Sequence, residues 1–223
     1  MTKKLFIKAL IKFTLGLLVI GLLIFIPAGT LSYINGWIFI SILFIPMFIV
    51  GIVLIIKDPQ LLKSRLDAKE KQKVQSIVIK LSGLMFIIGF VLAGLDFRFK
   101  WINIPSWITY VSSVVFLLGY LMYGIVLKEN RYLARTIKVS EGQKVIDTGL
   151  YGIVRHPMYT STLIMFLSMP LVLGSLVSFF VFLLYPILII IRIKKEEKLL
   201  EKELDGYVNY KKKVKYRLIP FIF

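Results

Sequence analysis

The stretch PMYTSTLIMFLSMPLVLGSLVSFFVFLLYPILIIIRI, residues 157–193, holds two apolar runs that are separated only by Gly174-Ser175. Each run, about 157–173 and 176–193, approaches the roughly 20 apolar residues with which an α-helix spans a bilayer. A glycine–serine break leaves room only for a tight turn, so the two runs are predicted to form a helical hairpin. Such a hairpin returns the chain to the side of the membrane from which it entered.

Four more apolar runs precede this hairpin, at about 5–27, 34–56, 77–96 and 105–127. Of the 223 residues, 58% are hydrophobic and the mean hydropathy is +0.83, whereas a soluble domain contains about 45–50% apolar residues. The N-terminal run is too long for a signal peptide and no small-residue cleavage site follows it. The sequence therefore predicts an all-α, polytopic membrane helix bundle of about six spans, with a cytosolic C-terminal helix.

The basic residues lie between the apolar runs, and their positions set the predicted orientation. All but two of the 29 Lys and Arg residues fall in four segments: the N-terminus up to Lys12, Lys57 to Lys80, Lys128 to Arg155, and Arg192 onward. With six spans these segments share one side, so the positive-inside rule places both termini in the cytoplasm. The formal net charge of +17 is then a feature that faces membrane lipids, and no nucleic-acid partner is predicted. A prokaryotic cytoplasmic membrane is the expected location.

The chain has no cysteine and one histidine. This composition excludes disulfides, thiolate metal sites, a cysteine nucleophile and a histidine-cluster metal site, so no metal is predicted.

The polar segments between the spans differ in character. Residues 57–76 are basic and are predicted to lie at the membrane interface, either as a helix after Pro59 or as a solvated loop against anionic lipid. Residues 129–152 alternate apolar and polar positions around a turn, which predicts a small hairpin or an extended loop, and polar loops of this length are often functional. After the last span a charged helix follows, which Gly206 weakens or ends, and residues 217–223 return to the bilayer surface.

Arg155-His156-Pro157 stands at the border between the second of these loops and the hairpin. Proline suits the first position of a helix, and the free N–H groups of a helix start attract anions. Arg155 adds a guanidinium fork that matches a ligand carboxylate or phosphate. The alternative is that Arg155 is a positive-inside anchor and His156 an interfacial residue.

Glu196 and Glu197 directly follow the last span and are close in sequence to Arg192. A carboxylate there is able to accept ribose hydroxyls or to balance a cationic ligand, although a solvated helix of mixed charge is the alternative. Because the hairpin brings the helix start at Pro157 and the exit at Arg192 to the same side, the two features are expected to face one another.

Three separated blocks, Asn130, GQKVIDTGLYGIVRHPMY and EEKLLEKELDGYVNYKKKVKYRLIP, together resemble the isoprenylcysteine carboxyl methyltransferase family, to which phospholipid N-methyltransferases are related. The resemblance covers about the last 95 residues, and the first three spans offer no diagnostic motif. It divides the chain into N-terminal transmembrane helices (1–127) and a cofactor-binding catalytic region (128–223).

The resemblance implies S-adenosylmethionine as the methyl donor and a lipophilic acceptor, with the carboxylate of an isoprenylcysteine-like molecule as one candidate. Arg192 matches a basic residue near the substrate group and is the implied catalytic and substrate-binding residue. Where the family usually has Phe-Gly before the first Tyr of the tail, this chain is one residue shorter, so Glu197 stays an alternative to Glu196. The implied cofactor-binding residues are Gln143, Lys144, Val145, Ile146, Tyr151, His156, Pro157, Met158, Tyr159 and Glu196.

Two other functions remain open from the sequence. An NADPH-dependent membrane reductase of the steroid-reductase type has a similar C-terminal region, but Met158 and the acidic pair favour the methyltransferase. A small transporter or structural membrane protein would place functional polar residues within the spans, whereas the apolar cores hold no charge. For the methyltransferase, the acceptor is expected to arrive from the bilayer and the donor from the cytosol, with the site at their meeting point.

Overall fold

The computed structural model describes residues 2–66, 73–133, 139 and 142–223, and within them it is all-helical, with no strand. This confirms the predicted all-α membrane bundle. In chain order the elements are α1 (Thr2–Ala28), α2 (Ile34–Lys57), α3 (Pro59–Leu66), α4 (Lys73–Phe99), α5 (Ser106–Glu129), the 3-10 turn η1 (Gly149–Gly152), α6 (Pro157–Val172), α7 (Leu176–Phe182), α8 (Tyr185–Glu203) and α9 (Tyr207–Lys213).

Among the described residues, five helical segments are long and apolar enough to cross a membrane. The four N-terminal ones match the predicted runs, and the fifth is Leu176–Glu203, so the chain is an integral membrane protein. The remaining predicted span, 157–173, forms α6, which is apolar but has only 16 residues. At about 1.5 Å per residue it is about 24 Å long, somewhat less than the hydrocarbon core of a bilayer.

The predicted hairpin is present, with a turn at Gly174, whose φ is +76°, and at Ser175. The Ser175 side chain accepts a hydrogen bond from the Ser178 N–H (3.1 Å) and so caps α7. The second arm differs from the prediction, because it is divided into α7 and α8 and does not end near residue 193. Pro186 lies in the first turn of α8, where its missing N–H is tolerated, and α8 then continues without interruption to Glu203.

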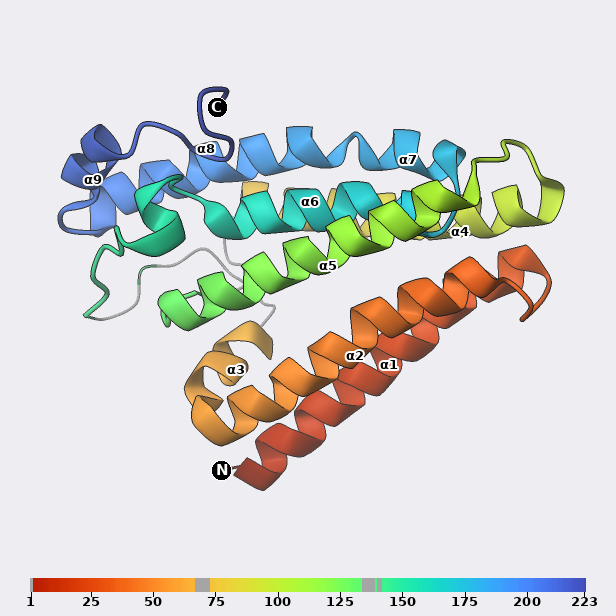
Figure 1. The fold of residues 1–223 in the computed structure, drawn as a ribbon. Helices are drawn as coiled ribbons and strands as arrows, with labels where there is room; N and C mark the ends of the chain where they lie inside the picture. The colour runs from red at the N-terminus through yellow and green to blue at the C-terminus, as the bar shows by residue number, and fades with distance from the viewer. Residues whose placement is uncertain (1, 67–72, 134–138, 140–141) are drawn as a thin grey trace.

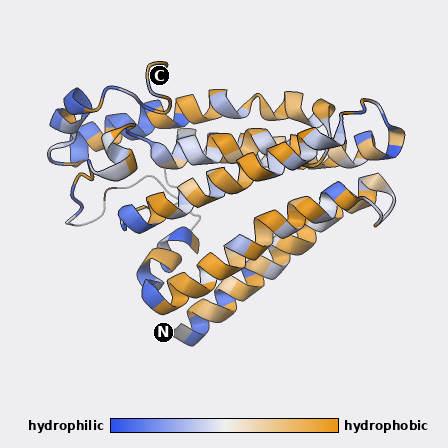
Figure 2. Cartoon of the chain, viewed as in Figure 1, coloured by the Kyte–Doolittle hydropathy of each residue, from blue (hydrophilic) through white to orange (hydrophobic). Residues whose placement is uncertain are grey.

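Figure 1 shows α4 to α8 gathered in one bundle, with α1 and α2 as an antiparallel pair beside it. The pair contacts the bundle near the end of α1, where Gly94 of α4 packs against the backbone of Ile24 and Ala28. Toward the N-terminus the pair diverges from α5, and α3 lies at this open end (Figure 1). Hydrophilic residues concentrate at the two ends of the molecule, as Figure 2 shows, and the helices between them are hydrophobic.

The segments outside the spans fold back onto the bundle. The predicted helix after Pro59 is α3, in which Leu61 and Leu62 are buried. Residues 143–147 belong to no helix or strand of the described part of the chain, while residues 134–138 and 140–141 of the predicted hairpin or loop lie outside the described residues. Gly206, with φ +83°, separates α8 from α9, which confirms that the charged helix ends before it.

The final residues do not simply return to the bilayer surface as predicted. The carbonyls of Tyr216 and Arg217 accept hydrogen bonds from the N–H groups of Arg155 and His156, both at 2.9 Å. Leu218 is buried, although Phe221 and Ile222 are exposed. The C-terminal segment is therefore attached to the chain immediately before α6.

Candidate functional site

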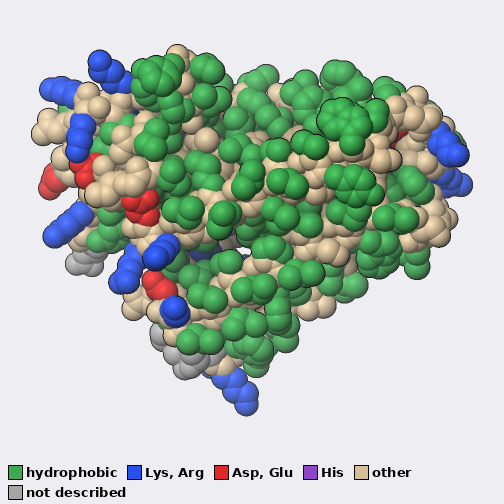
Figure 3. Space-filling model, in the orientation of Figure 1, with side chains coloured by type: hydrophobic (Ala, Val, Ile, Leu, Met, Phe, Trp, Pro, Cys, Tyr) green, Lys and Arg blue, Asp and Glu red, His purple; other side chains and the backbone are tan. Residues whose placement is uncertain are grey.

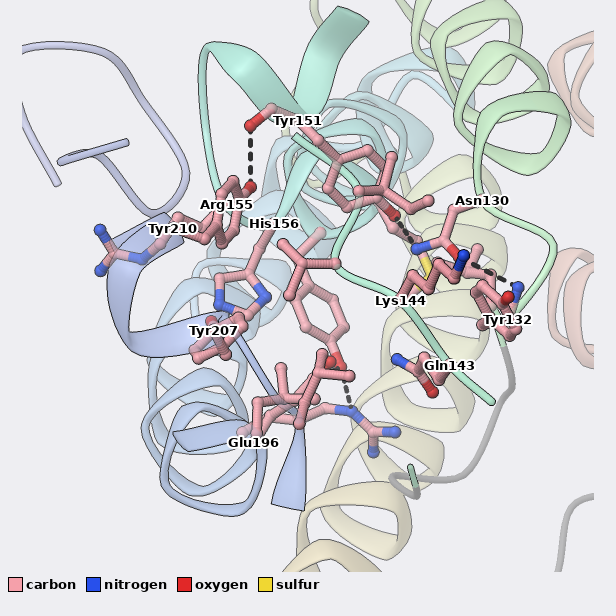
Figure 4. A pocket seen from close by; sticks show the side chains of 18 residues that line it. Asn130, Tyr132, Gln143, Lys144, Tyr151, Arg155, His156, Glu196, Tyr207 and Tyr210 are labelled. Carbon is pink, nitrogen blue, oxygen red and sulfur yellow. Dashed lines mark hydrogen bonds between the residues drawn. The ribbon is translucent and has the colours of Figure 1, made fainter. Parts of the chain in front are cut away.

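A polar cavity of about 100 Å³ lies at the predicted cytosolic end of the bundle. Residues from the segments 130–133 and 143–146, from η1, from the start of α6, and from α8 and α9 converge on it, as Figure 4 shows. Its lining residues are Asn130, Tyr132, Leu133, Gln143, Lys144, Val145, Ile146, Tyr151, Arg155, His156, Met158, Tyr159, Arg192, Glu196, Leu200, Leu204, Tyr207 and Tyr210.

All the residues predicted to bind a cofactor line this cavity, with the exception of Pro157. Pro157 is fully buried as the first residue of α6, so its role is to start the helix that carries Met158 and Tyr159. The stretch 143–146 and α8 both contribute to the lining, although the 38 residues 147–184 separate them in sequence. The fold therefore brings the three resembling blocks together around one cavity.

The two adjacent glutamates occupy different environments. Glu196 lines the cavity, and its Oε2 accepts a hydrogen bond from the Tyr159 hydroxyl (2.5 Å). Glu197 points to the other side of α8 and is 3% exposed. Its Oε1 lies 2.7 Å from Arg155 Nε and 3.3 Å from His156 Nε2, and its Oε2 lies 2.9 Å from Arg217 Nε. The geometry thus offers Glu196, and not Glu197, to a ligand.

The guanidinium group of Arg155 does not face a ligand site in the way that the sequence predicted. The side chain is buried, and it donates to Glu197 and to the carbonyls of Val214 (2.7 Å) and Lys215 (2.8 Å). The alternative prediction, that Arg155 anchors the chain at the membrane surface, does not describe it either, because its partners belong to α8 and the C-terminal segment. Arg155 connects three segments in the wall of the cavity, and a buried ion pair of this kind is costly to break.

A short hydrogen-bonded chain connects α6 to α8 at the floor of the cavity. The Arg192 Nε donates to the Tyr159 hydroxyl (2.8 Å), which in turn donates to Glu196. Arg192 is 8% exposed, and its guanidinium carbon lies 5.9 Å from the centre of the Tyr159 ring. The predicted catalytic residue and the predicted cofactor-binding acid are therefore joined through one tyrosine.

Aromatic residues that the sequence reading did not select as site residues complete the cavity. Asn130 donates to the Tyr151 hydroxyl (2.9 Å), and the Tyr210 hydroxyl donates to the Tyr151 carbonyl (2.8 Å). Among the described residues the Tyr207 hydroxyl is buried without a hydrogen-bond partner. Burial, followed by the nearby carboxylates of Glu197 and Glu196, raises the pKa of Tyr207 well above its usual value, so the group stays a protonated donor. The sequence feature that could have identified Tyr207 and Tyr210 as site residues is their Tyr-x-x-Tyr spacing after Gly206.

A second, larger cavity of about 750 Å³ opens between the α1–α2 pair and the bundle. It is lined mainly by apolar side chains of α1, α2, α4, α5, α6 and α8, and the space-filling view in Figure 3 shows the surface hollowed in this region. Met158, Tyr159 and Arg192 line both cavities. Arg65 of α3 lines the apolar cavity as well, and no motif in the sequence indicated it.

Comparison with known proteins finds partial relatives among sterol reductases. The chain is 35% identical over 91 residues to the Delta(14)-sterol reductase TM7SF2 of Mus musculus and 32% identical over 93 residues to the Delta(14)-sterol reductase of Methylotuvimicrobium alcaliphilum. Each match covers 40% of this chain but only 22% of the relative, so the chain aligns with about a fifth of their length. A match to the Delta(14)-sterol reductase of Arabidopsis thaliana is 28% identical over 124 residues, 51% of this chain and 34% of that protein.

A family model matches most of the region that builds the polar cavity, from the second turn of α5 to the last turn of α8. Residues 110–202 match the Isoprenylcysteine carboxyl methyltransferase (ICMT) family, which confirms for this part of the chain the family that its sequence resembles.

Proposed function

We propose that the protein is an integral membrane methyltransferase that transfers a methyl group from S-adenosylmethionine to a lipophilic acceptor. One observation carries the proposal: a polar cavity and an apolar cavity meet at Met158, Tyr159 and Arg192. A water-soluble donor fits the first and a membrane-soluble acceptor fits the second. The family match over residues 110–202 supports a methyltransferase in particular.

The lining of the polar cavity suits the proposed donor. A sulfonium cation is attracted by aromatic faces, which Tyr151, Tyr159 and Tyr207 supply, and by a carboxylate, which Glu196 supplies. The Tyr207 hydroxyl, which has no hydrogen-bond partner in the described part of the chain, is a donor for a hydroxyl or carboxylate of the ligand. Gln143 to Ile146 would add backbone groups, and Lys144 a positive charge for the amino-acid carboxylate.

When bound, S-adenosylmethionine supplies an electrophilic methyl group, so the transfer needs no metal and no covalent bond to the protein. The acceptor would supply the electron pair of the new bond, and the electron pair of the broken carbon–sulfur bond would stay with sulfur, so the protein would only have to hold the two ligands in line. Tyr159 and Arg192 fix the position where the two ligands meet, and the surrounding apolar side chains exclude water. If the acceptor is an ionised carboxylate, no general base is required; Arg192 then orients the anion.

A membrane reductase is the second candidate, because the partial relatives are sterol reductases. NADPH carries phosphate groups, which proteins hold with several available cations. In the polar cavity the guanidinium of Arg155 is committed to Glu197 and two carbonyls, which favours the donor with one carboxylate.

Calorimetry on the purified protein in detergent tests the choice directly. We expect S-adenosylmethionine to bind and NADPH not to bind, and we expect Glu196→Gln to weaken the binding of S-adenosylmethionine about tenfold or more, since a charged partner is lost. Binding of NADPH without binding of S-adenosylmethionine would reverse the assignment. Labelled methyl transfer in membranes then identifies the acceptor.

A further inference from the structure

The N-terminal half contributes a residue to the meeting point of the two cavities. We propose that Arg65 of α3 is a specificity-determining residue that, together with Arg192, binds an anionic head group of the acceptor. The inference deepens the proposed function and rests on it in so far as the bound amphiphile is the acceptor. It assigns a role in the site to a helix that lies outside the family match, which begins at residue 110.

The described charged residues around the apolar cavity have one sign. Within residues 2–66, 73–133, 139 and 142–223, the charged residues that line it are Lys12, Arg65 and Arg192, and none is an Asp or Glu. A volume of about 750 Å³ lies within the range of small-molecule sites, and most of the lining is aliphatic or aromatic. An occupant with an apolar tail and an anionic head matches this distribution better than a neutral or cationic lipid does.

Arg65 is placed at the inner part of this cavity by contacts to two helices. Its Nη1 lies 3.8 Å from the sulfur of Met158, and its Nη2 donates to the Tyr123 hydroxyl. Its guanidinium carbon is 5.5 Å from the centre of the Tyr123 ring. Arg65 thus touches Met158, one of the three residues that both cavities share, while Arg192 touches the adjacent Tyr159. Two guanidinium groups therefore flank successive residues of the first turn of α6.

The position of Arg65 is fixed by the way α3 is attached. Leu61 and Leu62 are 4% and 6% exposed, and the Leu61 N–H donates to Asp58 Oδ1 (3.0 Å) at the start of the helix. At the other end, Lys12 of α1 donates to the Leu66 carbonyl (2.5 Å). A solvated loop would leave Arg65 in water, whereas this docking directs it into the cavity. A planar guanidinium that is held in place is well suited to bind a carboxylate through two parallel hydrogen bonds.

The test measures binding of two amphiphiles with the same long alkyl tail, a carboxylate and its methyl ester, to the purified full-length protein in nanodiscs. At pH 7.5 the carboxylate is ionised, so the ratio of the two dissociation constants reports the contribution of the anionic head group. We expect the protein to prefer the carboxylate at least about tenfold, because hydrogen bonds to charged groups contribute about 1.5–3 kcal/mol. Arg65→Ala should remove most of that preference, and Arg65→Lys should keep part of it.

Lys63→Ala is the matched control, because Lys63 is an exposed cation on the same helix that lines neither cavity. It should retain the preference of the unmodified protein. A preference that survives Arg65→Ala, or equal affinity for carboxylate and ester in the unmodified protein, would overturn the proposal. A neutral amphiphile that binds more tightly than the carboxylate would instead indicate a sterol-like occupant.

Separate calorimetry with S-adenosylmethionine distinguishes this proposal from the proposed function. Arg65→Ala should change the dissociation constant for S-adenosylmethionine less than about twofold, because Arg65 does not line the polar cavity. If S-adenosylmethionine fails to bind while the preference for the carboxylate depends on Arg65, the methyltransferase assignment fails and the anion site stands. If S-adenosylmethionine binds and the preference for the carboxylate is absent, the anion site fails and the methyltransferase assignment stands.

Discussion

At the scale of single residues, adjacent acids with the same side chain serve opposite purposes. Glu196 faces the polar cavity and accepts a hydrogen bond from Tyr159, whereas Glu197 is surrounded by Arg155, His156 and Arg217. Successive residues on a helix point about 100° apart, so neighbours in sequence are easily separated between a site and a core. The sequence predicted an acid at this position but left the choice between the two open, because only the three-dimensional partners of Glu197 decide it.

The two glutamates are therefore expected to separate binding from stability. Glu197→Gln should lower the free energy of unfolding by about 3 kcal/mol, since it leaves buried cations without their counter-charge. Glu196→Gln should leave thermal unfolding in detergent nearly unchanged and weaken ligand binding instead. Thermal scans and calorimetry on both variants check this pair, and equal loss of stability in both would contradict the separation.

Tyr207 provides a second contrast between binding and stability. Its buried hydroxyl has no partner among the described residues, so Tyr207→Phe should leave stability unchanged or raise it slightly. The same change should weaken S-adenosylmethionine binding about threefold to tenfold if the hydroxyl donates to the ligand. Because burial raises the pKa of Tyr207, the group keeps its proton, and its contribution to binding should not decline between pH 7 and 9. Calorimetry at both pH values measures this, and Tyr207→Phe binding that equals the unmodified protein would exclude the hydroxyl from the site.

At the scale of elements, the long helices were predictable and the segments that fold back were not. A run of about 20 apolar residues specifies a span locally, so α1, α2, α4 and α5 follow the sequence closely. The docking of α3 depends on Leu61 and Leu62 contacting other helices, and the path of residues 214–218 depends on Arg155 and the backbone of His156. Such contacts between distant segments carry no periodic pattern that a single sequence reveals.

Close packing of α1 against α4 depends on one glycine. A Cβ at Gly94 would lie 2.4 Å from the Ile24 carbonyl oxygen and 3.0 Å from the Ala28 nitrogen, so the two backbones have no room for it. Gly94→Ala should therefore destabilise the protein by about 1–3 kcal/mol. Gly21→Ala, in α1 with no atom within 4 Å of the added Cβ, is the matched control and should be neutral or slightly stabilising. Thermal unfolding of both variants in the same detergent decides the comparison.

At the scale of the whole molecule, both ends of the chain and α3 lie at the same end of the bundle, with the connection between α4 and α5 at the other (Figure 1). Charge distribution predicts that the end with the termini faces the cytoplasm, and this orientation stays a prediction. The predicted division into two regions at residue 127 also stays a prediction. The contacts of α5 with α6 run across that boundary. The apolar cavity could not be predicted from sequence, since it depends on the angle at which the α1–α2 pair leaves the bundle.

The absence of cysteine makes the orientation easy to test. Lys63→Cys in α3 and Asn103→Cys in the α4–α5 connection both place a single thiol at an exposed position. In intact spheroplasts a membrane-impermeant maleimide should label Asn103→Cys only, and permeabilisation should make Lys63→Cys reactive, as the positive-inside rule requires. The opposite labelling pattern would invert the topology.

The meeting of two cavities at three residues has a consequence for how the proposed reaction would be supplied. Under the proposed function neither ligand would have to pass the other, because the donor would approach from the aqueous phase and the acceptor from within the bilayer. Their concentrations would then be expressed in different units: the donor as molecules per volume of water, and the acceptor as a fraction of the membrane lipids. Adding detergent to an assay would dilute only the acceptor, so the apparent rate should follow the ratio of acceptor to detergent even when its total concentration is held constant.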